Sequence, residues 1–267
     1  MFHYSDKGEC ADKDVLSFAI ASEIAAGRGT EHGGVAFDAS GVGRERLEEA
    51  YSAYVKRYRA VGMDIAEQAM EIAPAAHTSL GGVYARPDCS TRTEGLFVCG
   101  ETLGGLHGAN RIGGCAGAET VTFGAAVGES AAGVNELSEA ELSRAEELAG
   151  ALVEEYRAPK DSRPEKVEEL LASLRETVGK DLSLIRDERG LREASDTFEK
   201  LNEAAETIGA ADTKELVNLT SLKNMLLTAK LIAKASLERK ESRGVFYRSD
   251  YPEKKPAWNK SIVLKMR

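Results

Sequence analysis

The sequence predicts a mostly helical α+β protein, in which a small mixed region precedes a helical bundle and an extended C-terminal tail. Two shifts in composition along the 267 residues indicate this order. Glycine and other small residues crowd the stretch 27–133, whereas residues 136–240 are poor in glycine and rich in Glu, Leu, Ala and Lys. From residue 241 onward the chain is aromatic, basic and punctuated by proline. Such shifts mark boundaries between structural regions.

The overall composition argues against several classes of protein. Lys and Arg number 35 against 44 Asp and Glu, and the resulting net charge of −9 argues against nucleic-acid binding. No apolar run approaches the roughly 20 residues of a membrane span, and no signal peptide is visible. The four cysteines form no Cys-x-x-Cys pair and the four histidines lack ligand spacing, so we expect no disulfide and no metal site. Reduced thiols in the cytoplasm are the simplest interpretation.

Helical patterns open and close the first region. Apolar residues recur at helical spacing over residues 13–26, and Gly27 ends the pattern. A second helix is predicted over residues 44–59, and a third, lined by small residues, over residues 115–132. The apolar face of the second helix consists of Leu47, Tyr51, Tyr54, Val55 and Tyr58.

Three short strands are predicted between these helices, at residues 70–73, 82–85 and 96–99. The last of them is apolar on successive residues, as in a strand that is buried on both faces. It runs directly into Gly100 and Glu101.

Four helices are predicted in the glycine-poor region. Ser138 and Glu141 form a capping box at the start of the first helix, and Pro164 suits the first position of the second. The fourth helix runs from about Thr213 to Arg239. Apolar stripes mark the first three, and we interpret them as core: Leu142, Ala145, Leu148, Leu152 and Tyr156; Val167, Leu170, Leu171, Leu174 and Val178; Leu191, Ala194, Phe198, Leu201, Ala205 and Ile208.

Two segments of the first region carry residues suited to chemistry, at 77–82 and 95–114. A buried strand that ends in Gly-Glu can place a carboxylate on a ribose diol, and glycines ahead of a helix let backbone N–H groups approach a ligand closely. The guanidinium of Arg111 suits forked pairing with a carboxylate. A glycine-rich turn with a structural arginine is the alternative.

The order of these segments resembles the flavoprotein subunit of the succinate dehydrogenase/fumarate reductase family, which includes L-aspartate oxidase and adenylylsulfate reductase. Residues 77–82 match the family's His-x-x-x-Gly-Gly, residues 95–101 its Gly-Leu-Phe-Ala-x-Gly-Glu, and the stretch from His107 onward its His-Gly-Ala-Asn-Arg-Leu-Gly-Gly-Asn-Ser-Leu. Within the last motif, Cys115 and Ala116 stand where the family has Asn-Ser. The stretch 241–252 looks like its Glu-Ser-Arg-Gly-x-His-x-Arg-x-Asp-Tyr/Phe-Pro, and 8–14 like its Glu-Leu-x-x-Arg-Asp.

The resemblance covers only the C-terminal part of that family and implies a domain order. Residues 1–73 would be the end of the capping (substrate) domain and residues 74–135 the C-terminal part of the FAD-binding domain. Residues 136–240 would form the helical bundle domain and residues 241–267 the tail. The N-terminal dinucleotide-binding unit is absent from the sequence, so the chain looks like a fragment or a half-subunit that is inactive alone.

The resemblance also implies roles for single residues. His77 and Arg111 would bind a substrate carboxylate, and Glu101 would hold the ribose of FAD. Lys13 stands where the family has its proton-donating arginine. The other cofactor-binding positions implied by the match are Gly100, His107, Ala116 and Gly117. The structural alternatives are a core histidine for His77, a surface carboxylate for Glu101 and a solvated first-turn lysine for Lys13.

Two classes of function remain open at this point. In the first, the chain belongs to an FAD-dependent oxidoreductase that transfers hydride between flavin and a dicarboxylate. Its partners would be an N-terminal FAD-binding half and an iron–sulfur subunit, which would place it in the cytoplasm, peripheral to the inner face of the membrane. In the second, it is a non-catalytic structural or assembly subunit. Three departures from the family's motifs favour this class: Lys13 in place of Arg, Ala116 in place of Ser and Phe246 in place of His.

Overall fold

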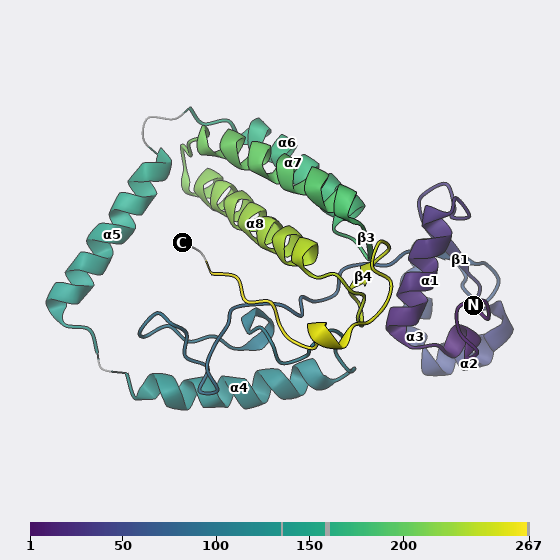
Figure 1. The fold of residues 1–267 in the computed structure, drawn as a ribbon. Coiled ribbons are helices and arrows are strands. Elements are labelled where there is room, and N and C mark those ends of the chain that lie inside the picture. Colours follow the sequence, from purple (N-terminus) through teal and green to yellow (C-terminus); the bar gives the residue numbers. More distant parts are fainter. Residues whose placement is uncertain (135, 158–160, 266–267) are drawn as a thin grey trace. The chain divides into compact units, whose positions relative to one another are not determined.

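A computed structural model describes residues 1–134, 136–157 and 161–265. The chain divides into two compact units, Met1–His77 and Thr78–Arg267. The described residues form eight α-helices and only short strands, which confirms the predicted fold class (Figure 1). The finer division of the chain at residues 73, 135 and 240 stays a prediction.

The first unit packs helices beside a two-stranded antiparallel ribbon. Helix α1 (Lys13–Ala25) ends one residue earlier than predicted, ahead of Gly27 with its positive φ of 74°. Strand β1 (Val35–Phe37) pairs with β2 (Met70–Ile72), which confirms the strand predicted at residues 70–73. The small core of this unit consists of Ala39, Leu47, Val55, Ile65 and Met70.

The single helix predicted over residues 44–59 is wrong, because the chain breaks at Tyr51. Helix α2 (Arg44–Ala50) and helix α3 (Ser52–Arg59) flank this residue, which has φ −129° and ψ 32°. In one straight helix, Leu47 and Val55 would point about 80° apart. Both are buried in the same small core, whereas Tyr51 is 52% exposed. The break thus accompanies burial of the two aliphatic side chains. Of the tyrosines on the predicted face, Tyr51 and Tyr54 are exposed and Tyr58 packs against the edge of the core.

The strands predicted at residues 82–85 and 96–99 are absent from the structure as well. Residues 78–114 are irregular apart from the 3₁₀ helix η3 (Gly100–Thr102). Only isolated bridges occur, one from Val83 to Leu103 and one from Ser90 to Phe97. Leu96 is 53% exposed, so its segment is not buried on both faces. Its apolar run supplies only Val98 to a core cluster with Cys89 and Leu103.

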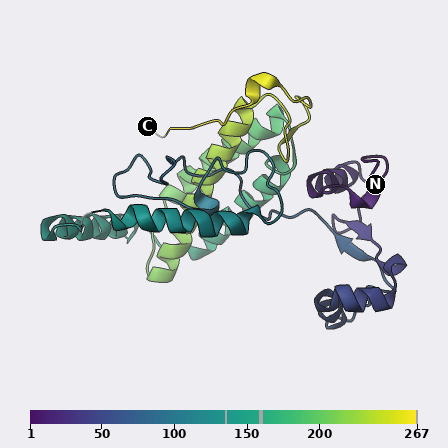
Figure 2. The ribbon, with the colours of Figure 1, turned by 90° about the horizontal axis from the view of Figure 1, so that it is seen from below.

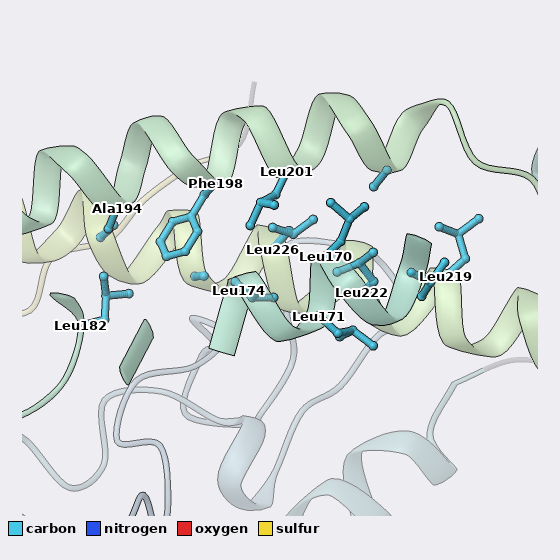
Figure 3. Close-up of a cluster of buried hydrophobic side chains, with 14 of the residues drawn as sticks. Leu170, Leu171, Leu174, Leu182, Ala194, Phe198, Leu201, Leu219, Leu222 and Leu226 are labelled. Carbon is cyan, nitrogen blue, oxygen red and sulfur yellow. The ribbon is translucent and has the colours of Figure 1, made fainter. Parts of the chain in front are cut away.

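Three helices form the main core of the second unit: α6 (Pro164–Asp181), α7 (Glu188–Glu206) and α8 (Thr213–Glu238). Pro164 opens α6 as predicted. The carboxylates of Asp187 and Asp212 cap α7 and α8 by accepting backbone N–H groups. Figure 3 shows Phe198 and Leu201 pointing from α7 toward the leucines of α6 and α8. The predicted apolar stripes of α6 and α7 are therefore core, except for Val178, which is 36% exposed.

Helix α5 (Glu139–Arg157) departs from that prediction. Its capping box is confirmed, because the Glu141 carboxylate accepts the Ser138 N–H over 2.8 Å. Yet none of its described side chains is buried, and Leu148 and Leu152 are 62% and 57% exposed. Of its predicted stripe, Tyr156 packs against the bundle core. The interpretation of the rest of the stripe as core is wrong for this chain, because no described element covers it.

The first part of the tail packs against the helical bundle. Strand β4 (Tyr247–Arg248) pairs in parallel with β3 (Ile185–Arg186), which lies between α6 and α7. A 3₁₀ helix, η4 (Pro256–Trp258), follows. In Figure 2 the yellow ribbon of η4 lies beside one end of α8, and the chain after it runs away from that end. Helix α4 (Cys115–Ala132) completes the unit. None of the helices in the described residues has both the length and the apolar character to cross a membrane.

Candidate functional site

The two chemistry-bearing segments meet in the second unit. The Ser79 N–H donates to Oε1 of Glu101 over 2.7 Å, which links the 77–82 segment to η3. The Val83 N–H donates to the carbonyl oxygen of Thr102 over 2.8 Å. Both segments are exposed at this point. The backbone of the 77–82 segment therefore holds the Glu101 carboxylate. Glu101 does not, however, follow the buried strand that the sequence predicts.

Gly82 is required by this approach of the two backbones. A Cβ atom at Gly82 would lie 2.2 Å from the carbonyl oxygen of Thr102 and 2.8 Å from the backbone nitrogen of Gly104. Real Cβ atoms do not come so close to backbone, so any other residue would push the segments apart. The glycine of the 77–82 motif is thus explained by packing.

The loop of residues 104–114 leaves its backbone open ahead of α4. A Cβ atom at Gly105, Gly108 or Gly113 would meet nothing within 4 Å. Gly114 has a left-handed φ of 83° and forms the N-cap of α4, whose first turn contains Ala116 and Gly117. The first N–H groups of a helix lack intrahelical partners and favour anionic or electron-rich groups.

A buried ion-pair geometry joins this loop to α4. Nε2 of His107 lies 2.9 Å from Oε2 of Glu119, which is 8% exposed. The second oxygen of Glu119, Oε1, has no hydrogen-bond partner among the described residues. A buried carboxylate oxygen without a donor carries a cost in free energy. A bound group that supplied an N–H or O–H donor there would remove that cost.

Arg111 is the buried cation of the loop, at 8% exposed, between the exposed residues Asn110 and Ile112. Burial of a guanidinium is costly unless its donors are engaged. Its rigid fork matches a carboxylate in two parallel hydrogen bonds. This residue type suits a carboxylate partner, and the role of Arg111 in substrate binding stays a prediction.

Lys13 and His77 belong to the other compact unit. Lys13 is the first residue of α1 and is exposed; His77 is exposed in the irregular segment after β2. Gly100, Glu101, His107, Arg111, Ala116 and Gly117 all lie in the second unit. The structure thus brings most of the proposed site into one unit, and the roles of Lys13 and His77 stay predictions.

The cysteines beside the site are free thiols. Cys89 is fully buried, and burial, with a smaller effect from Cys99, raises the pKa of its thiol. It is therefore a protonated core residue at neutral pH. Among the described residues, no group of three or more His, Cys, Asp and Glu side chains has the arrangement of a metal site.

Sequence reasoning missed Ser79 and Glu119. For Glu119 a signal existed, since it is an acidic residue among the small residues that open the helix at 115–132. For Ser79 none existed, because its contribution is a backbone N–H.

Comparisons with known proteins support the resemblance. An FAD-binding domain family matches residues 1–116, and the fumarate reductase flavoprotein C-terminal family matches residues 171–266. One of the subunits of fumarate reductase (CoM/CoB) from Methanothermobacter marburgensis is 37% identical over 99% of this chain and 49% of its own length. L-aspartate oxidase of Rhodospirillum rubrum is 32% identical over 93% of this chain and 80% of its own length.

The chain belongs to the succinate dehydrogenase/fumarate reductase flavoprotein family. The Sdh1 complex of Mycobacterium smegmatis in the apo form contains a chain with the same fold, at a TM-score of 0.77 and 32% identity over 95% of this chain and 44% of that one. The chain spans about half the length of several curated relatives that it matches.

FAD is the cofactor of this flavoprotein. The residues of the second unit fit that group on two observations. The loop before α4 leaves glycine backbone open for close approach, and the buried Oε1 of Glu119 lacks the donor that a ribityl hydroxyl or a ring N–H would supply. Both are features of the chain itself.

Proposed function

We propose that this chain forms the C-terminal portion of an FAD-dependent oxidoreductase that transfers hydride between flavin and a dicarboxylate. The observation that carries the proposal is the buried Arg111 in the glycine-rich loop that leads into α4. Membership of the succinate dehydrogenase/fumarate reductase family supports the reaction type. The identity of the acid, whether succinate, fumarate, aspartate or another, is a matter for the experiment below.

Three side chains of this chain would act on the substrate. Arg111 pairs with one carboxylate and orients the acid, because its fork fixes both distance and plane. His77 donates a hydrogen bond to a substrate carboxylate. Lys13 delivers a proton on the substrate face opposite the flavin. Its ammonium is a point charge on a flexible stem, so its geometry differs from that of the family's arginine.

The cofactor would rest on residues of the second unit. Glu101, next to Gly100 in η3, accepts hydrogen bonds from the ribose hydroxyls, and the first turn of α4 at Ala116 and Gly117 presents N–H groups to the flavin ring. His107, whose Nε2 lies 2.9 Å from Oε2 of Glu119, belongs to the loop of residues 104–114. Bound FAD supplies the hydride acceptor and donor.

The proposed partners are based on the fraction of its relatives' length that this chain spans, which is about half for several of them. We propose that the pyrophosphate and adenine of FAD rest mainly on an N-terminal FAD-binding half outside residues 1–267, and that an iron–sulfur subunit exchanges electrons with the flavin. The similarity to a chain of the Sdh1 complex supports an assembly of this kind. A cytoplasmic location, peripheral to the inner face of the membrane through such partners, completes the proposal.

A non-catalytic structural or assembly subunit is not favoured. Its support was the loss of family residues at Lys13, Ala116 and Phe246. The buried Oε1 of Glu119, which has no hydrogen-bond partner among the described residues, keeps a costly polar atom in place. A subunit without ligand chemistry gains nothing from this atom.

The test is turnover by this chain combined with its N-terminal FAD-binding half. Oxidation of a reduced dye is followed while fumarate is added, and reduction of an oxidised dye while succinate or aspartate is added, with a monocarboxylate of equal length as control in each direction. We expect turnover with a dicarboxylate and none with the monocarboxylate, because the proposed reaction acts on dicarboxylates. Full flavin content with no turnover of any dicarboxylate would refute the proposed reaction and favour the non-catalytic class.

A further inference from the structure

The tail of the chain touches the loop that contains Arg111. The Val245 N–H donates to the carbonyl oxygen of Ala109 over 2.9 Å. Ala109 lies two residues before Arg111, and both residues belong to the same compact unit as the tail. This backbone hydrogen bond fixes the position and direction of the loop two residues before the buried guanidinium.

Gly244 brings the tail and the loop closer than a side chain would allow. Its φ is +58°, in the left-handed region, and a Cβ atom there would lie 2.2 Å from the carbonyl oxygen of Ala109 and 2.6 Å from its carbonyl carbon. Both the backbone conformation and the space thus demand glycine. Any other residue must displace either the tail or the loop.

The tail is rigid on one side of this contact because of Glu241. This carboxylate is fully buried and accepts two hydrogen bonds from Arg243, at 2.7 and 3.0 Å. It also accepts one from Arg239 at 2.7 Å and one from the Lys255 N–H at 2.8 Å. Such a set of charge-assisted bonds fixes residues 239–243 as one piece.

On the other side of the contact, Arg248 anchors the tail to the helical bundle. Its side chain is fully buried and donates to the carbonyl oxygen of Ser236 on α8 over 2.5 Å, and to Asp250 over 2.7 and 2.6 Å. The β3–β4 pairing adds a second attachment. The Gly244–Val245 turn is therefore held from both ends by the bundle.

We propose that the segment 241–251 positions the Arg111 loop, with Gly244 and Val245 as the positioning residues. The path runs from α8 through the buried charges of the tail to the Ala109 carbonyl, and from there to Arg111. The inference rests on the proposed function of Arg111 as the substrate-binding cation. A forked carboxylate contact tolerates little displacement, since errors of about 1 Å can cost roughly 100-fold in rate.

The first test is hydrogen exchange of the backbone amides at residues 107–114 in the chain itself. Gly244→Ala is compared with Gly62→Ala, which imposes the same kind of backbone strain at φ +81° but meets nothing within 4 Å. We expect exchange in the loop to become at least about tenfold faster in Gly244→Ala and to stay unchanged in Gly62→Ala. Equal exchange in both variants would overturn the proposal, whatever the enzyme's activity.

A milder pair of variants covers the case in which Gly244→Ala does not fold. Arg243→Lys removes the forked hydrogen bonds to Glu241 without adding a clash. Its control is Arg192→Lys, which removes two hydrogen bonds to Oε1 of Glu188 on the exposed face of α7. We expect faster exchange at residues 107–114 only in Arg243→Lys. No difference between these two variants also counts against the proposal.

The second test uses the enzyme combined with its FAD-binding half. Gly244→Ala should lower kcat/KM for the dicarboxylate by about 100-fold at unchanged flavin content. A merely structural role would lower flavin content and thermal stability and leave the kinetics per bound flavin intact, and that result would overturn the positioning role. If the unaltered enzyme turns over no dicarboxylate, the proposed function fails, and the coupling of tail and loop is then judged by the exchange data alone.

Discussion

Arg111 and Lys13 are the residues whose side-chain chemistry separates the proposed roles most sharply. Arg111 is buried in the second unit, whereas Lys13 is exposed at the start of α1. A guanidinium makes two parallel hydrogen bonds to a carboxylate, and an ammonium cannot reproduce that geometry. The two positions should therefore respond in opposite ways to exchange of arginine and lysine.

The first prediction is that Arg111→Lys costs more activity than Lys13→Arg. Loss of the fork should cost about 2–4 kcal/mol of transition-state stabilisation, by analogy with loss of one preorganised donor. Lys13→Arg restores the residue type that the family uses and should be neutral or raise the rate. Dye-linked dicarboxylate turnover of the two variants, each combined with the FAD-binding half, measures both effects. If Arg111→Lys is silent and Lys13→Arg abolishes turnover, the assigned roles are wrong.

The second prediction concerns Glu241 and acid stability. The hydrogen bonds from Arg243 lower the pKa of this carboxyl from its ordinary value of 4.5 to about 2. A lowered folded-state pKa stabilises the fold above the unfolded-state value, and this stability is lost as pH falls. The free energy of unfolding should therefore decrease between pH 4.5 and about 2.

Urea unfolding across that pH window measures the effect. In Glu241→Gln the decrease should be smaller, because the titrating group is gone, and the variant should be less stable than the unaltered chain above pH 4.5. Glu193→Gln, on the exposed surface of α7, serves as the control and should follow the unaltered chain. Identical pH profiles for Glu241→Gln and the control would contradict the prediction.

At the scale of elements, helices of similar amphipathic pattern differ in what they pack against. Helices α6, α7 and α8 share one core, whereas α5 has the same kind of stripe and no buried side chain among those described. The hydrophobic pattern alone does not distinguish a packed helix from an exposed one. The spacing of apolar residues shows which face is apolar, but it does not show which element covers that face.

The third prediction compares one residue from each case. Phe198→Ala should destabilise the chain by about 3–5 kcal/mol, because Phe198 is fully buried between the bundle helices. Leu148→Ala in α5 should cost less than about 0.5 kcal/mol, because Leu148 is 62% exposed. Denaturant unfolding of both variants gives the two values. A cost above about 2 kcal/mol for Leu148→Ala would mean that α5 is packed in solution.

At the scale of the whole molecule, the question is how much of the cofactor this chain can hold. The second unit offers a carboxylate, an open glycine loop and a helix N-terminus. Under the proposed division of the cofactor, the contacts to pyrophosphate and adenine come from a dinucleotide-binding half outside residues 1–267. Binding of FAD would then depend on groups from both parts.

The fourth prediction is that the chain alone binds FAD weakly or not at all. The proposed partner half would supply the contacts that usually hold the pyrophosphate on a helix N-terminus of a dinucleotide-binding unit. Equilibrium dialysis of the chain with FAD tests this, and addition of the N-terminal half should restore tight binding. Micromolar or tighter binding to the chain alone would show that the division of the cofactor is wrong.

The sequence by itself determined the local features of this protein. Period and end signals predicted α1, α4 and α8 to within one residue at each end, and Pro164 opens α6 as expected. For α7 they predicted the apolar stripe without exact bounds, and the capping box of α5 forms as expected. These features depend on residues a few positions apart, so the chain carries them wherever it folds. The ordered motifs likewise gave the family and the residues of the proposed site, because they fix residue types at short spacing.

Only the tertiary structure decided which elements meet. The 96–99 run supplies a buried Val98 without a strand, the 44–59 helix breaks at Tyr51, and α5 keeps its stripe exposed. The pairing of His107 with Glu119 and the contact of Gly244 with Ala109 also lie beyond any local pattern. Gly244 and Ala109 stand 135 positions apart in the sequence (244 minus 109). Burial and close approach depend on such distant neighbours, whose positions are set by the packed fold and not by the spacing of residues along one segment.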